Sequence, residues 1–143
     1  MVRAPMNLRA ALVTIVPLPM LGYVVYESSP PTWGLMEIAG LALLVSSALL
    51  LTLARWQLGR AFSVLPEATV LVTGGLYRRI RNPVYVFGLT LFAGLILYFD
   101  RPSLLLLLIP LAAVQIVRAG REAKVLEERL GEDYRAYRAQ TWF

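Results

Sequence analysis

A run of 22 residues, Trp33–Ala54, has the sequence WGLMEIAGLALLVSSALLLTLA and contains a single charged side chain, Glu37. About 20 consecutive apolar residues form an α-helix long enough to cross the roughly 30 Å of hydrocarbon in a bilayer. The whole chain of 143 residues is 58% hydrophobic and has a mean hydropathy of +0.64, which is too apolar for a soluble domain of this size. The sequence therefore predicts an all-α integral membrane protein.

Three further apolar segments make the predicted protein polytopic. Leu8–Tyr26 is also long enough to span a bilayer, whereas Val84–Phe99 and Ser103–Val117 are shorter. Only residues 100–102 separate these two shorter segments, which predicts a tight helical hairpin. We expect a single membrane-embedded domain, residues 1–143, with about four transmembrane helices and a cytosolic C-terminal helix.

The distribution of positive charge predicts the orientation of these helices. Of the 14 Lys and Arg residues, 13 lie near the N-terminus, between the second and third apolar segments, or after the fourth. Arg101 alone lies in the hairpin turn. Because positively charged loops stay in the cytoplasm, both termini and the long middle segment are expected there. The net charge of +5 suits contact with anionic membrane lipids, and no nucleic-acid partner is expected.

The absence of Cys and His limits the chemistry available to the chain. Disulfides, thiolate nucleophiles, His-based metal sites and Ser-His relays are excluded, and no metal site is expected. Any catalysis must use Glu, Asp, Tyr, Asn, Arg or backbone groups.

The most distinctive polar segment lies directly before the third apolar segment. It has the sequence GGLYRRIRNPVY, from Gly74 to Tyr85, and precedes Glu122 by about forty residues. Its two glycines suit a turn, or the close approach of a nucleoside to the backbone. Asn82 followed by Pro83 predicts a helix N-cap and the first residue of a helix.

The C-terminal segment continues a helical pattern beyond the fourth apolar segment. Leu126, Leu130, Tyr134 and Tyr137 recur at three- and four-residue spacing, so one face is expected to pack. Gly131 comes directly before two acidic residues, which predicts a break and the start of a new helix.

Taken together, these segments resemble the isoprenylcysteine carboxyl methyltransferase and phospholipid methyltransferase superfamily, in a small bacterial form. The resemblance covers about Leu58–Tyr137 and rests on motifs in a fixed order: Leu58-Gly59-Arg60 with Phe62-Ser63, Gly74-Gly75-Leu76-Tyr77, Arg81-Asn82-Pro83-Val84-Tyr85, Arg118 with Glu122, and Leu126, Leu130-Gly131, Tyr134 and Tyr137. It implies a membrane enzyme that transfers a methyl group from S-adenosylmethionine to a small lipophilic or lipid-attached acceptor arriving from the bilayer. Either carboxylate O-methylation or phospholipid amine N-methylation is implied, at the cytosolic face of a bacterial inner membrane.

The resemblance also implies the site residues, within about 58–85 and 118–138. Arg81, Asn82 and Glu122 are the implied catalytic residues. The implied cofactor-binding residues are Gly75, Leu76, Tyr77, Arg81, Asn82, Pro83, Tyr85, Arg118 and Glu122.

Two departures from the family pattern fall within this site. Asn82 replaces the usual His, and Ala123 stands where a second Glu is frequent, so one carboxylate is left. Asn forms hydrogen bonds but cannot titrate near neutral pH. Simpler roles also fit: Glu122 could pair with Arg118 in solvent, and Tyr77 and Tyr85 could be interfacial aromatic residues.

Small residues in the last two apolar segments leave two further possibilities. Gly88, Gly94, Ala112 and Ala113 allow either close helix packing or a lateral groove for an acyl or prenyl chain.

Two other classes of function remain open. The chain could be a non-catalytic membrane interaction module derived from this family. A small four-helix transporter is disfavoured, because it would carry an ionisable residue deep in a span, and Glu37 lies only a few positions into its segment. The sequence does not indicate the oligomeric state.

Overall fold

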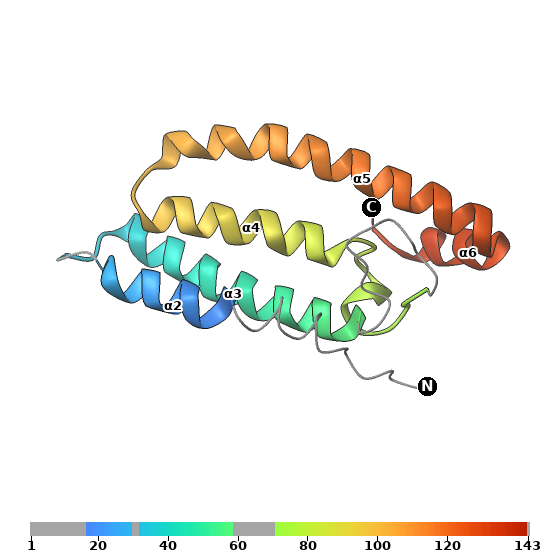
Figure 1. Ribbon diagram of the computed structural model, residues 1–143, viewed down its shortest axis with the longest axis horizontal. Coiled ribbons are helices and arrows are strands. Elements are labelled where there is room, and N and C mark those ends of the chain that lie inside the picture. The colour runs from blue at the N-terminus through green and yellow to red at the C-terminus, as the bar shows by residue number, and fades with distance from the viewer. Residues whose placement is uncertain (1–16, 30–31, 59–70, 143) are drawn as a thin grey trace.

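The computed structural model describes residues 17–29, 32–58 and 71–142. Within these residues the protein is all-α, as predicted (Figure 1). The described residues form five α-helices and two 3₁₀ helices, in this order: α2 (Pro17–Glu27), α3 (Leu35–Leu58), η2 (Gly75–Arg78), α4 (Pro83–Tyr98), η3 (Pro102–Leu107), α5 (Leu108–Leu130) and α6 (Glu132–Gln140). Part of the first expected span and much of the middle segment lie outside the described residues.

Two of the described helical stretches are long and apolar enough to cross a membrane. These are Leu35–Leu58 and the continuous stretch Pro102–Leu130. α4 is apolar, but its 16 residues rise only about 24 Å, less than the thickness of the hydrocarbon core. Of the about four expected spans, two are therefore candidates within the described residues.

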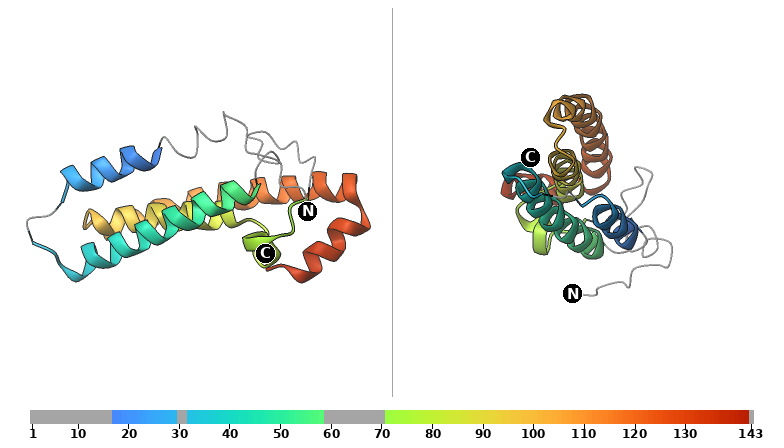
Figure 2. Two further views of the ribbon diagram at one scale, coloured as in Figure 1. Left: turned by 90° about the horizontal axis from the view of Figure 1, so that it is seen from below. Right: turned by 90° about the vertical axis from the view of Figure 1, so that its left-hand side faces the viewer.

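The closest helix contact joins α3 and α4, which lie side by side in both views of Figure 2. A Cβ atom added to Gly94 would lie 2.6 Å from the backbone nitrogen of Leu44, and one added to Gly40 would overlap the backbone of Tyr98. Ser47 donates a hydrogen bond to Thr90 across the same contact, at 2.9 Å. Of the two possibilities that the sequence leaves open, Gly94 therefore fits close packing of α3 and α4.

α4 and α5 form the predicted hairpin and run antiparallel (Figure 1). The fourth apolar segment differs from the expected single helix, because it begins as η3 and becomes α-helical at Leu108. Pro110 therefore lies in the first turn of α5, where a missing backbone N–H leaves no hydrogen bond unmade.

α5 ends at Leu130, and α6 turns back beside it (Figure 1). Gly131 joins the two helices with a φ of 52°, a left-handed conformation that favours glycine. Arg135 bridges the elbow by pairing with Glu127 at 2.9 Å and with Glu132 at 2.7 Å. The predicted break and new helix are both confirmed.

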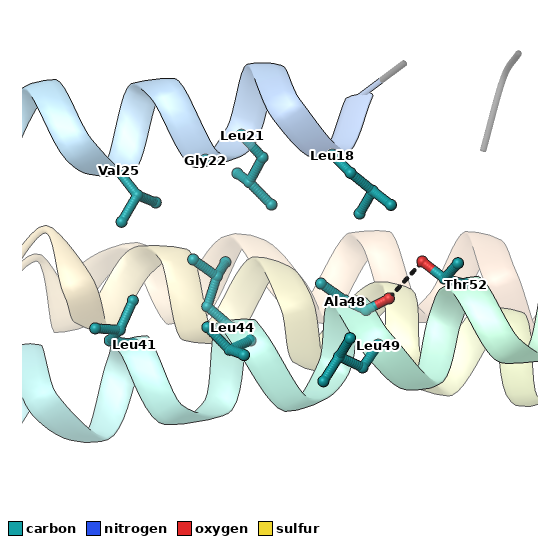
Figure 3. A pocket seen from close by; sticks show the side chains of 10 residues that line it. Leu18, Leu21, Gly22, Val25, Leu41, Leu44, Ala48, Leu49 and Thr52 are labelled. Carbon is teal, nitrogen blue, oxygen red and sulfur yellow. Dashed lines mark hydrogen bonds between the residues drawn. The ribbon is translucent and has the colours of Figure 1, made fainter. Parts of the chain in front are cut away.

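An apolar pocket of about 240 Å³ separates α2 from α3 (Figure 3). Thr52 is its only lining residue with a polar side chain, and that hydroxyl donates to the carbonyl of Ala48 at 2.7 Å. Beside the pocket, the Tyr98 hydroxyl donates to the carbonyl of Val25 at 2.6 Å and ties α2 to α4. None of the predicted site residues lines this pocket.

Candidate functional site

The predicted site residues gather at one end of the bundle, where α3 ends, α4 begins and α6 folds back (Figure 1). The short helix η2 links these elements. It contacts α3, and its Tyr77 carbonyl accepts a hydrogen bond from the Tyr137 hydroxyl of α6 at 2.7 Å. Residues 58–85 and 118–138, predicted to form one site, therefore meet here in the part of the chain that the structure describes.

The turn at Gly75 is fixed by a residue that the sequence analysis did not identify. Gly75 has a φ of 62°, which favours glycine, and a Cβ atom there would overlap the side-chain amide of Gln57. The Leu76 N–H donates to Gln57 Oε1 at 2.7 Å. The space above Gly75, which could have admitted a nucleoside, holds Gln57, while the cofactor roles of Gly75 and Leu76 stay predictions.

Tyr77 is the most enclosed polar residue of η2, with 6% of its surface exposed. Its hydroxyl oxygen is buried and has no hydrogen-bond partner among the described residues. Burial raises the pKa of Tyr77 above its usual value, and the neighbouring Tyr137 and Glu122 raise it further. Tyr77 therefore presents a neutral hydroxyl to its surroundings at physiological pH.

α6 covers this turn with two tyrosines, as the spacing predicts. Tyr134 is 1% exposed and Tyr137 is also buried, with their ring centroids 6.3 Å apart. Burial raises the pKa of Tyr137 to about 12, with Tyr134 adding to the shift. Burial also raises the pKa of Tyr134, while nearby Arg81 opposes that shift. α6 thus covers Tyr77, whereas Arg78 and Arg79 stay exposed.

The chain end forms a second contact with that segment, which the sequence analysis also missed. Trp142 pairs in parallel with Ile80, as an isolated β-bridge. Its N–H donates to the carbonyl of Arg79 at 2.8 Å, and its carbonyl accepts from the Arg81 N–H at 3.4 Å. Backbone pairing leaves no side-chain pattern in the sequence, so only the tertiary structure reveals it.

α4 begins as the Asn82-Pro83 pair predicts, with Asn82 at the N-cap and Pro83 as the first helical residue. The Asn82 side chain makes no capping hydrogen bond, so that part of the expectation is wrong. Its backbone carbonyl accepts from the Tyr85 and Val86 N–H groups at 3.1 and 3.2 Å. Next to this pair, Arg81 has a buried Nε with no hydrogen-bond partner among the described residues.

Glu122 joins α5 to the start of α4. Its carboxylate accepts a short hydrogen bond from the Tyr85 hydroxyl, although the residues are 37 positions apart. The guanidinium of Arg118 lies over the Tyr85 ring, 5.8 Å from the centroid, at a distance typical of a cation–π contact. Glu122 is half-buried, so the alternative of a purely solvated charge does not describe it.

The structure thus brings Arg81, Asn82, Glu122, Tyr77, Pro83, Tyr85 and Arg118 to one end of the bundle, with Gly75 and Leu76 at its edge. Two of these residues offer buried polar atoms that have no partner within the described residues. Such atoms are rare in folded proteins and call for a ligand or water. In that same part of the chain, no cluster of three Asp, Glu, His or Cys residues could hold a metal ion.

Comparison with known proteins agrees with this arrangement. The family model for phospholipid methyltransferases matches residues 35–133, which is more than half of the chain and runs from α3 to the start of α6. No curated protein and no solved structure matches the chain. Members of the matched family are S-adenosylmethionine-dependent methyltransferases of lipids, within the superfamily that the sequence motifs resemble. The chain therefore belongs to the phospholipid methyltransferase family.

Proposed function

We propose that this protein transfers a methyl group from S-adenosylmethionine to a lipid-borne acceptor, at the end of the bundle formed by η2, α4 and α5. One observation carries the proposal: the Tyr77 hydroxyl and Arg81 Nε are buried and have no hydrogen-bond partner among the described residues, and the nearby Glu122 carboxylate contributes to the raised pKa of Tyr77. Buried polar atoms without partners are uncommon in folded proteins, and a bound ligand would supply partners for both.

The polar groups at this site match those of S-adenosylmethionine. Arg81 could donate a hydrogen bond to its carboxylate, and Glu122 could accept one from its amino group or a ribose hydroxyl. The faces of Tyr77 and Tyr85 suit the positive charge of a sulfonium. When bound, the cofactor supplies a methyl group that is already activated for transfer.

The chain itself then has mainly to align the acceptor and exclude water. Transfer forms a bond from the nucleophile to the methyl carbon as the carbon–sulfur bond breaks, with its electron pair remaining on sulfur. A carboxylate nucleophile needs no base, whereas a protonated amine must first lose a proton. Glu122 suits that role better than Glu127, which pairs with Arg135 and Arg138 at the elbow between α5 and α6.

The site is proposed to face the cytosol, with the acceptor entering from the bilayer. The positive-inside distribution of Lys and Arg supports this orientation. Glu122 follows the apolar segment Ser103–Val117 by five residues on the same helical stretch, so a lipid-borne group could reach it at the membrane surface. The second candidate is a non-catalytic module derived from this family, which would keep the fold but bind no methyl donor. The departures at Asn82 and Ala123 are what favour it.

Tyr77→Phe tests the proposed cofactor site. We expect this variant to bind S-adenosylmethionine about three- to tenfold more weakly in calorimetry in detergent, as for the loss of one neutral hydrogen bond. Its melting temperature should not fall, because the deleted hydroxyl has no partner among the described residues. Tyr26→Phe, at a residue that is 75% exposed, is the matched control.

Calorimetry also separates the two candidate functions. Absence of binding by the wild-type protein would favour the non-catalytic module. Equal affinity of the wild-type and Tyr77→Phe proteins would remove Tyr77 from the site.

Trp142→Pro tests whether the chain end positions Arg81. Proline lacks the N–H that bonds to Arg79, and Thr141 already has the extended backbone that precedes proline, with φ −111° and ψ 150°. Trp142→Ala keeps the N–H and removes a side chain that is 69% exposed. We expect the proline variant to bind S-adenosylmethionine severalfold more weakly than the alanine variant, and equal affinities would contradict a positioning role.

A further inference from the structure

Gln115 is a polar residue in an otherwise apolar stretch. It is the only polar side chain between Leu104 and Val117, within the candidate span Pro102–Leu130. Its Oε1 atom is buried and has no hydrogen-bond partner among the described residues. Leaving an amide oxygen unpaired in an apolar environment is unfavourable. A ligand that bonds to Gln115 would remove this cost.

Gln115 lies on the face of α5 that carries the candidate site. Glu122 follows it by seven residues, which is about two helical turns, or roughly 10 Å along the axis. The flanking Val114 and Ile116 are 58% and 72% exposed, whereas Gln115 is half-buried. The amide is therefore turned inward, on the side where Glu122 meets Tyr85 of α4.

The facing helix α4 carries a glycine between Tyr85 and the level of Gln115. α4 runs antiparallel to α5, so the residues that follow Tyr85 lie level with those that precede Glu122 (Figure 1). Gly88 shares the Tyr85 face at i+3 spacing, and a Cβ atom added there would meet no described atom within 4 Å. Gly88 therefore lies about midway along the axis between the level of Glu122 and the level of Gln115, where α4 presents no side chain.

We infer that Gln115 determines acceptor specificity, by accepting a hydrogen bond from an N–H or O–H group on the apolar acceptor. The inference rests on the proposed function in taking the bound molecule to be the acceptor. Two helical turns between Gln115 and Glu122 separate acceptor recognition from the proposed cofactor groups. A carboxylate acceptor has no proton to donate and would have to use the amide nitrogen instead.

Three single-chain probes, each with a main chain of ten carbons, separate these chemistries: decylamine, decyltrimethylammonium and decanoate. The first two are cations, but only the amine has N–H donors. Each is added below its micelle-forming concentration to the purified full-length protein in detergent, and the shift in melting temperature is measured. Because a ligand stabilises the state that it binds, the shift reports binding without turnover.

We expect decylamine to raise the melting temperature of the wild-type protein more than the other two probes. Gln115→Leu, which has similar volume and no polar atoms, should abolish that preference, corresponding to about tenfold weaker amine binding. The variant itself should melt no lower than the wild type. Gln140→Leu makes the same chemical change at an exposed residue and should keep the preference.

The inference would be overturned if the wild type showed no preference for decylamine, or if Gln115→Leu kept that preference. It would also be overturned if Gln115→Leu, without any probe, melted at a lower temperature than the wild type while Gln140→Leu did not. A preference for decanoate that Gln115→Leu abolishes would instead assign a carboxylate acceptor. Calorimetry with S-adenosylmethionine on the same samples keeps the two proposals distinct. Amine preference without cofactor binding would contradict the proposed methyl transfer and leave Gln115 as a lipid-recognition residue.

Discussion

The Glu122→Gln protein is expected to bind S-adenosylmethionine about 10- to 100-fold more weakly than the wild type, as for the loss of one hydrogen bond to a charged group. Glutamine keeps a carbonyl oxygen that can accept from the Tyr85 hydroxyl, so the contact between α4 and α5 should survive. Calorimetry in detergent gives the affinity, and a thermal melt shows whether the fold is intact.

Glu128→Gln is the matched control for this experiment. Glu128 lies six residues further along α5 and is exposed, so its charge is not part of the candidate site. We expect the Glu128→Gln protein to bind S-adenosylmethionine with an affinity within twofold of the wild type. If Glu122→Gln and Glu128→Gln behave alike, Glu122 serves only the helix contact with Tyr85.

If the acceptor is an amine, Glu122→Gln should lower the rate of methyl transfer by a larger factor than it lowers the affinity for S-adenosylmethionine. In that case the same carboxylate must also accept a proton, and glutamine cannot. Turnover at saturating S-adenosylmethionine separates the two roles. A variant that regains wild-type turnover once the cofactor is saturating would show that Glu122 only binds, as expected for a carboxylate acceptor.

Gly94→Leu is expected to have the largest effect on stability. A Cβ atom at this position would lie 2.6 Å from the Leu44 nitrogen and 3.0 Å from the Gly40 carbonyl oxygen. Both are backbone atoms, which cannot rotate aside, so α3 and α4 must separate. We expect a loss of about 3 kcal/mol in the free energy of unfolding, at the upper end of the usual cost of overpacking. A denaturation curve in detergent measures it.

Gly120→Leu provides the control, because a Cβ atom there meets no described atom within 4 Å. Removing a glycine from a helix should stabilise α5 by about 0.5 to 1 kcal/mol. Wild-type stability of Gly94→Leu, with selective loss of turnover on long-chain acceptors, would instead restore the lateral-groove interpretation.

The candidate site connects α3, α4 and α6, so a substitution in one of these helices should alter the position of residues in the others. Gln57 at the end of α3 holds the η2 turn, Tyr137 of α6 bonds to Tyr77, and Trp142 pairs around Ile80. Each contact lies within a few residues of Arg81 or Asn82 along the chain. The hydrogen bonds are local, but together they set the direction in which the chain enters α4.

The sequence by itself determined the helical class, the family and the breaks between elements. Apolar runs, the Asn82-Pro83 pair and Gly131 act through local backbone preferences, so the start of α4 and the start of α6 could be predicted without knowing any tertiary contact. The same holds for the packed tyrosines of α6, whose spacing follows the helical repeat.

Only the tertiary structure decided which polar groups meet and which are left unpaired. Nothing local distinguishes Gly94, buried against α3, from Gly88, which faces open space, since both lie in α4. The hydrogen bond from Tyr85 to Glu122 and the pairing of Trp142 join residues far apart in sequence. The oxygens of Tyr77 and Gln115, which have no partner among the described residues, likewise depend on how the other helices pack around them. Such properties arise from the packing of whole helices against one another, which no local preference encodes.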